Sequence, residues 1–117
     1  DMTDITIWHN PRCSKSRATL HLLQENGIAP AQREYLEEPP SADEIKHVLA
    51  ALGMTASELV RRGEAVYKKL NLSTASSEDA LITAMTNNPI LIERPVVIAA
   101  NKAALGRPPE NVLSLLP

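Results

Sequence analysis

A single thiol sets the chemistry that this sequence can perform. Cys13 is the one cysteine in 117 residues, and it lies in the segment His9-Asn10-Pro11-Arg12-Cys13-Ser14-Lys15-Ser16-Arg17. With one cysteine the chain can form neither an intramolecular disulfide, nor a Cys-x-x-Cys redox pair, nor a multi-cysteine zinc site. Redox chemistry at this residue therefore needs a thiol from outside the chain.

The residues around Cys13 favour a reactive thiolate. We expect the cysteine at or just before a helix start, where unsatisfied backbone N–H groups and the helix dipole stabilise negative charge. From Ile5 to Gln24 the chain carries Arg12, Lys15 and Arg17 but no aspartate or glutamate. We therefore predict a lowered pKa for the thiol, in preference to the alternative of a buried and inert cysteine.

The same helix start is suited to binding an oxyanion, because its backbone donors are joined by the hydroxyls of Ser14 and Ser16. With Arg17 these are the candidate substrate-binding residues next to the thiol. The Cys-x5-Arg loop of tyrosine phosphatases is disfavoured, because it requires an arginine where the chain has Thr19. His9 has two interpretations: it polarises the thiol, or it lies at the surface where a strand ends.

Composition narrows the function classes. A net charge of -2 argues against a polyanion-binding surface, and the few aromatic residues, Trp8, Tyr35 and Tyr67, nearly exclude base stacking on nucleic acid. His21 and His47 lack metal-ligand spacing, so we expect no metal site. No apolar run approaches the roughly 18 residues of a membrane span, and no secretory signal pattern is seen. We expect a cytoplasmic protein that binds neither nucleic acid nor a membrane.

The predicted elements indicate an α/β class in one domain, 1–117. Strands are expected at Ile5–Trp8 and Gln32–Leu36, on either side of a helix from Ser14 to Asn26. This β-α-β unit is typical of parallel pairing. Strand character returns at Pro95–Ala99 and continues in a hairpin through Ala103 to Leu105, and a final helix follows Pro108.

Short capped helices fill the middle of the chain. Ser41 with Glu44 forms a capping-box pattern, and Thr55 with Glu58 repeats it. Ser76 or Ser77 is expected to begin a third helix. The sequence thus predicts a core at about 3–37 and 89–117, with a helical insertion at about 38–88.

Two arginines stand out at the ends of the expected hairpin. Arg94 directly precedes Pro95, and Arg107 directly precedes Pro108. A single arginine is most often a solvated side chain. Two arginines held next to prolines at opposite ends of one hairpin are better candidates for binding an anion.

Four segments together resemble the glutaredoxin-coupled arsenate reductases, and most closely a branch of small bacterial proteins similar to these enzymes. The cysteine segment carries the pattern His-Asn-Pro-x-Cys-x-x-Ser-Arg, and Arg-Pro-Val-Val begins at Arg94. The matching segments follow one another over essentially the whole chain: residues 5–17, Leu59-Val60-Arg61, residues 88–97 and Gly106-Arg107-Pro108.

The resemblance implies a thioredoxin-like core with a helical insertion, and a cis peptide bond between Arg94 and Pro95. It also implies that the Cys13 thiolate attacks arsenate or a similar oxyanion. Glutathione would be the co-substrate, glutaredoxin would resolve the mixed disulfide, and no cofactor would be bound. The residues implied to hold the oxyanion are Arg61, Arg94 and Arg107, with Arg62 as the alternative to the first.

Two other functions are compatible with these residues. One is a general glutathione-dependent thiol oxidoreductase that uses Cys13 without a preference for arsenate. The other is an Spx-type regulator, which shares the fold and binds RNA polymerase without catalysis. The second is disfavoured, because the redox-sensing members carry a Cys-x-x-Cys pair and this chain has Ser16 at the second position.

Overall fold

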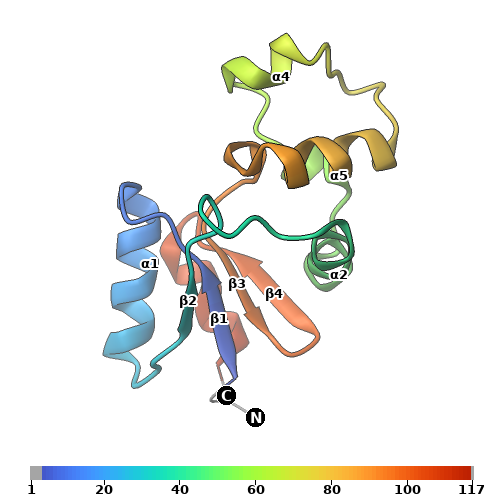
Figure 1. Ribbon diagram of the computed structural model, residues 1–117. Helices are drawn as coiled ribbons and strands as arrows, with labels where there is room; N and C mark the ends of the chain where they lie inside the picture. Colours follow the sequence, from blue (N-terminus) through green and yellow to red (C-terminus); the bar gives the residue numbers. More distant parts are fainter. Residues whose placement is uncertain (1–3, 117) are drawn as a thin grey trace. The chain divides into compact units, whose positions relative to one another are not determined.

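The computed structural model describes residues 4–116 and has an α/β fold (Figure 1). The chain divides into two compact units, one made of residues up to Glu38 and from Arg94 onward, the other of Pro39–Glu93. Positions 3 and 117, the outer limits of the predicted core, lie outside the described residues. None of the helices within residues 4–116 combines the length and the apolar character that a membrane span requires.

The first unit is built on a four-stranded mixed sheet with the strand order β2-β1-β3-β4. β1 pairs in parallel with β2 and antiparallel with β3, which in turn pairs antiparallel with β4. This β-α-β then β-β-helix order confirms the predicted thioredoxin-like α/β class. The elements in chain order are β1 (Ile5–Trp8), α1 (Ser14–Glu25), β2 (Ala31–Arg33), β3 (Val96–Ala99), β4 (Lys102–Leu105) and the 3-10 helix η2 (Pro109–Leu115).

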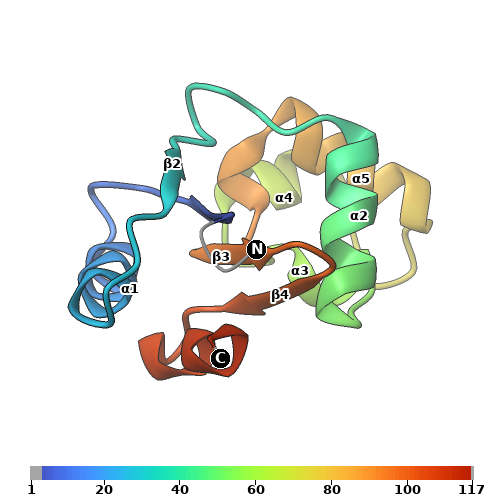
Figure 2. The same ribbon diagram turned by 90° about the horizontal axis from the view of Figure 1, so that it is seen from below.

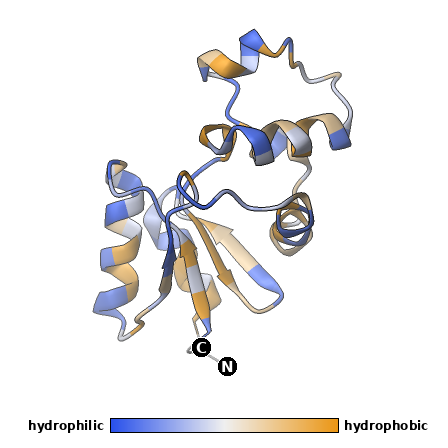
Figure 3. Cartoon of the chain, in the orientation of Figure 1, coloured by the Kyte–Doolittle hydropathy of each residue, from blue (hydrophilic) through white to orange (hydrophobic). Residues whose placement is uncertain are grey.

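One face of this sheet is covered by α1 and η2, which lie on the same side of the strands in Figure 2. Side chains alternate between the two faces of a strand, so Ile5 and Ile7 share a face, and Val97 is opposite Ile7 in the antiparallel register. Figure 3 shows the strands β1 and β3 as largely hydrophobic. The buried cluster consists of Ile5, Ile7, Leu23, Val97, Val112 and Leu115.

The second unit, Pro39–Glu93, is helical. Its helices are α2 (Ala42–Leu52), α3 (Ala56–Leu59), α4 (Ala65–Lys69), α5 (Glu78–Asn87) and the 3-10 helix η1 (Pro89–Leu91). Both predicted capping boxes are present, at Ser41 and at Thr55, and Ser77 caps α5 by accepting a hydrogen bond from the amide of Ala80. Val60 and Ile92 form an isolated antiparallel bridge that joins the ends of α3 and η1.

Two predicted elements differ from the structure. The second strand was predicted to reach Leu36 but ends at Arg33, because the amides of Glu37 and Glu38 turn back to the carbonyl of Glu34. The last helix is 3-10 rather than α-helical. A 3-10 helix has three residues per turn, so Val112 and Leu115 fall on one face and both are buried.

Candidate active site

Cys13 lies at the junction between a buried strand and a helix. β1 ends at Trp8, the following loop turns through a hydrogen bond from the Cys13 amide to the Asn10 carbonyl (3.0 Å), and α1 begins at Ser14. Cys13 is the N-cap residue of α1, with extended backbone angles, and its side chain is partly exposed. The thiol therefore stands at the positive end of a twelve-residue helix, as the sequence predicts.

The buried side chain of Ser16 holds the cysteine loop, residues 9–13, in place. Its hydroxyl oxygen lies 2.6 Å from Nδ1 of His9, and it also accepts a hydrogen bond of 3.0 Å from the backbone N–H of Asn10. Ser16 is fully buried, and His9 is 6% exposed. The hydroxyl predicted to face an oxyanion is therefore used inside the loop, and the part of Ser16 that faces the thiol is its backbone N–H.

Two further hydrogen bonds hold the outer part of the same loop. A guanidinium nitrogen of Arg17, Nη1, donates to the carbonyl oxygen of Pro11 at 2.9 Å. The amide of Arg12 donates to the side-chain oxygen of Asn10 at 3.0 Å. Every residue between His9 and Cys13 thus takes part in a hydrogen bond to the loop or to the first turn of α1. Because the loop is already ordered, a substrate that binds there pays a smaller cost in conformational entropy.

The pKa of the Cys13 thiol is lowered by its surroundings. Burial alone raises it, but the backbone N–H of Ser16, the Arg94 side chain and the backbone N–H of Lys15 act together in the opposite direction and prevail. Hydrogen-bond donors and positive charge lower the pKa of a thiol because they stabilise its charged form, the thiolate. The predicted lowering of the thiol pKa is therefore confirmed, but its charged source is Arg94 and not the predicted cations Arg12, Lys15 and Arg17.

The pKa of the His9 imidazole is lowered, mainly by burial and further by the charge of Arg17, while the carboxylate of Glu34 acts in the opposite direction. The interpretation of His9 as a surface residue is wrong, because the ring is buried against Ser16. Its hydrogen bond runs to Ser16 rather than to Cys13, so we place His9 as a residue that positions the loop.

The cis-proline segment lies next to the cysteine helix. The Arg94–Pro95 peptide bond is cis, as the family resemblance implies, and the Arg107–Pro108 bond is also cis. The Pro95 carbonyl accepts a hydrogen bond of 2.9 Å from the Gly106 amide. This bond ties the start of β3 to the end of β4, and so places Arg94 and Arg107 on two adjacent chain segments of one unit.

Gly106 permits this close approach. A Cβ atom added there would meet the Thr19 side chain and would lie 2.7 Å from Cγ of Pro95, inside van der Waals contact. Thr19 is buried, and its hydroxyl donates to the Lys15 carbonyl one turn earlier in α1 (2.8 Å). The close approach of Thr19 and Gly106 was not predicted; a threonine among the apolar positions of α1 was the available signal.

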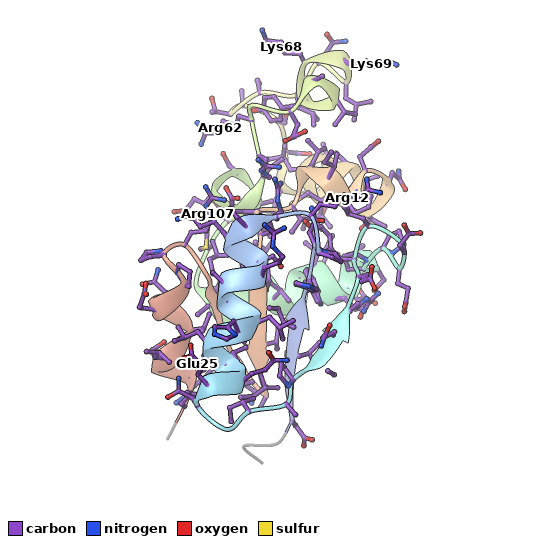
Figure 4. The ribbon with its side chains drawn as sticks, turned by 90° about the vertical axis from the view of Figure 1, so that its left-hand side faces the viewer. Arg12, Glu25, Arg62, Lys68, Lys69 and Arg107 are labelled. Atoms are coloured by element: carbon purple, nitrogen blue, oxygen red, sulfur yellow. The ribbon has the colours of Figure 1, made fainter. Side chains whose placement is uncertain are left out.

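Arg107 follows Gly106 and is exposed. Figure 4 shows Arg12 and Arg107 on opposite sides of the amino-terminal end of α1. Backbone N–H groups and the Cys13 thiol are present at this helix end, and such a helix start is suited to binding an anion. The substrate-binding role of Arg107 stays a prediction.

Residues 8–115 match the ArsC family. The chain belongs to this family. The matched residues include the cysteine loop, the cis-proline segment and Arg107.

Three similar proteins each match this chain over nearly their full lengths. YfgD, an uncharacterized protein of Escherichia coli strain K12, is 54% identical over 114 residues, which is 96% of each chain. An arsenate reductase of Neisseria meningitidis serogroup A is 45% identical and covers 98% of this chain and 100% of its own. The structure of an arsenate reductase from Vibrio cholerae superposes with a TM-score of 0.94, at 47% identity over 99% of this chain and 100% of that one.

The third arginine that the ArsC resemblance implies, Arg61, belongs to the Pro39–Glu93 unit. Its Nη1 lies 2.7 Å from a carboxylate oxygen of Glu64, and its Nε lies 3.6 Å from a carboxylate oxygen of Glu93. Its amide donates to the Leu91 carbonyl at 2.7 Å. The alternative, Arg62, is exposed (Figure 4) and forms no ion pair among the described residues. The substrate-binding role of Arg61 stays a prediction.

Proposed function

We propose that this ArsC-family protein reduces arsenate to arsenite through the Cys13 thiolate, with glutathione and glutaredoxin as the external reductants. The observation that carries the proposal is the partly exposed thiol of lowered pKa at the α1 start, beside Arg94. Relatives from Neisseria meningitidis and Vibrio cholerae that match the whole chain are named arsenate reductases, which supports the same substrate.

In the first step the Cys13 sulfur attacks the arsenic atom of arsenate. A sulfur–arsenic bond forms, an arsenic–oxygen bond breaks, and the oxygen leaves as water after protonation. The guanidinium groups of Arg94 and Arg107 and the amides at the helix start neutralise the oxyanion as it forms. Ser14, which is exposed beside the thiol, adds a hydroxyl donor to this set, and Arg61 is proposed as the third guanidinium.

In the second step the thiolate of glutathione attacks the Cys13 sulfur of the adduct. The sulfur–arsenic bond breaks, its electron pair passes to arsenic, and arsenite leaves with arsenic reduced from the pentavalent to the trivalent state. The two sulfurs are oxidised to a mixed disulfide. Glutaredoxin then attacks the glutathione sulfur and restores the Cys13 thiolate, which a chain with one cysteine cannot do alone.

We propose a cytoplasmic location for this protein, because of what the reaction requires. A reduced Cys13 and a pool of glutathione are both required, and the reducing cytoplasm supplies both. Ser16 and Arg17 act in this scheme through the loop: they hold the backbone that carries the thiol, by the bonds to His9 and Pro11.

A coupled turnover assay tests the substrate. Glutathione, glutaredoxin, glutathione reductase and NADPH are supplied, and NADPH oxidation is followed with arsenate or with a simple low-molecular-weight disulfide as the oxidant. Arsenate-dependent turnover with direct detection of arsenite is expected. Turnover of the disulfide with none of arsenate would assign the protein as a general thiol oxidoreductase and overturn the proposal.

A further inference from the structure

A small pocket opens next to the cysteine loop, on the side away from Arg107. It has a volume of about 170 Å³, and its lining comes from the loop before Cys13 and from the turn after β2: His9, Asn10, Pro11, Arg12, Glu34, Leu36 and Glu37. Arg12 lies on the β2 side of the α1 start in Figure 4. None of the steps proposed above uses this pocket.

The charges of the pocket are of both signs. Arg12 stands on one wall, and the carboxylates of Glu34 and Glu37 stand on the other. Within the described residues no ion pair joins the arginine to either carboxylate. A ligand group that carries one positive and one negative charge can therefore pair with the carboxylates and with the arginine at the same time.

The size of the pocket limits what can occupy it. Sites for whole drug-sized ligands measure about 300–1,000 Å³, so a pocket of about 170 Å³ holds one end of a larger molecule. The apolar part of its lining, Pro11 and the half-exposed Leu36, suits a short methylene chain. A zwitterionic head group on such a chain meets all of these requirements.

The position of the pocket points to the rest of the ligand. Arg12 lines it, and Cys13 is the next residue. An extended tripeptide spans about 10 Å, because each residue adds at most about 3.6 Å. A ligand anchored by its head group in the pocket can therefore present a thiol from its second residue at the Cys13 sulfur.

We propose that this pocket binds the α-amino acid head group, ammonium and carboxylate together, of a γ-glutamyl thiol peptide such as glutathione. Glu34 and Glu37 receive the ammonium group, Arg12 and Asn10 receive the carboxylate, and the γ-glutamyl methylenes lie against Pro11 and Leu36. This inference rests on the proposed function, since it assigns a place to the reductant of that reaction.

Binding of S-methylglutathione tests the assignment without any turnover, because the thioether cannot react. Its dissociation constant is measured by calorimetry for the wild-type protein and for Arg12→Gln, Glu37→Gln and Glu38→Gln. All three side chains are exposed, and Glu38 lies next to the pocket without lining it. We expect about fivefold weaker binding for the first two variants and unchanged binding for the third.

Two modified ligands identify the end that enters the pocket. N-acetyl-S-methylglutathione lacks the ammonium charge, so it should bind more weakly to the wild type and should not respond to Glu37→Gln. The glycine ethyl ester keeps the ammonium group and should respond to Glu37→Gln as the parent ligand does. No binding by the wild type, an equal loss in Glu38→Gln, or full affinity of the N-acetyl ligand overturns the assignment.

These outcomes separate the pocket from the proposed function. If arsenate turnover proceeds with glutathione but S-methylglutathione binding ignores Arg12 and Glu37, the pocket assignment fails and the reaction stands. If the pocket variants weaken binding as expected while arsenate gives no turnover, the reaction fails and the pocket stands.

Discussion

Ser16 and His9 meet behind the cysteine loop, with the Ser16 hydroxyl 2.6 Å from Nδ1 of the imidazole. This contact joins the first turn of α1 to the end of β1, and both side chains are buried. The same hydroxyl holds the Asn10 amide. The shape of the loop that presents Cys13 therefore depends on a side chain that is itself closed to solvent.

Replacing Ser16 by alanine removes both hydrogen bonds and leaves a buried imidazole nitrogen and an amide without partners. We expect the free energy of unfolding to fall by about 1–3 kcal/mol, as measured by urea denaturation. Ser14→Ala is the matched control, because Ser14 is exposed in the same helix turn, and it should change stability by less than about 0.5 kcal/mol. Equal stability losses in the two variants would show that the hydrogen bonds of the Ser16 hydroxyl do not stabilise the fold.

Arg94→Gln should raise the pKa of the Cys13 thiol, because Arg94 stabilises the thiolate by a hydrogen bond and by its charge. The pKa is measured from the pH dependence of the rate of alkylation by iodoacetamide. The wild-type rate should reach its plateau at a lower pH than that of an ordinary cysteine, and the variant plateau should move to higher pH. The control is Lys102→Gln, a cation of the same unit at the exposed start of β4. A variant curve that overlays the wild type would exclude Arg94 as a source of the shift.

His9 should make stability depend on pH. Its pKa is lowered in the folded protein from 6.5, so the unfolded chain binds the proton more readily. The contribution of the neutral ring is fully present above pH 6.5, and it is lost as the pH falls below that value. The urea midpoint should decrease from pH 7 to pH 5, and the decrease should be smaller in His9→Gln. In the control His21→Gln, which removes an exposed side chain 3.4 Å from a carboxylate oxygen of Glu25, the decrease should be no smaller than in the wild type. A His9→Gln variant with the full wild-type decrease would exclude His9 as a source of the pH dependence.

Gly106→Ala places a methyl group against Thr19 and Pro95. We expect a loss of about 1–3 kcal/mol in the free energy of unfolding, which is the usual effect of overpacking a buried contact. Gly63→Ala is the control, because nothing lies within 4 Å of a Cβ added there. Urea denaturation of both variants compares the two sites, and a Gly106 variant as stable as the Gly63 variant would show that the cis-proline segment tolerates the displacement.

Local signals in the sequence were sufficient for much of the fold. The alternation in Ile5–Trp8 predicted β1 to the residue, and the Ser41–Glu44 pattern predicted the start of α2, because both depend on neighbours in the chain. The end of β2 was missed, since the turn at Glu34 is closed by backbone hydrogen bonds that any residue type can make. The fully buried Tyr35 contributed an apolar position that resembled a continuing strand.

The candidate site, too, could be predicted from the sequence only in part. The place of Cys13 at a helix start followed from the sequence, because helix position is a local property, and the backbone N–H groups of that helix start lower the thiol pKa. The charge that lowers it further belongs to Arg94, which is distant in sequence, and not to the neighbouring cations from which the lowering was predicted. The inward direction of the Ser16 hydroxyl and the contact of Gly106 with Thr19 did not follow. Both depend on packing between segments, and in the second case 87 positions separate the two residues.

Arsenite formation by the wild-type protein and by Cys13→Ser decides whether the Cys13 thiolate attacks arsenate. Arsenate, glutathione and glutaredoxin are supplied, and arsenite is separated from arsenate and quantified over time. We expect steady formation of arsenite by the wild type, dependent on both thiol components. With Cys13→Ser we expect only the uncatalysed background, because the chain has no other cysteine to form the sulfur–arsenic bond. Arsenite formation by Cys13→Ser at the wild-type rate would contradict attack by the Cys13 thiolate.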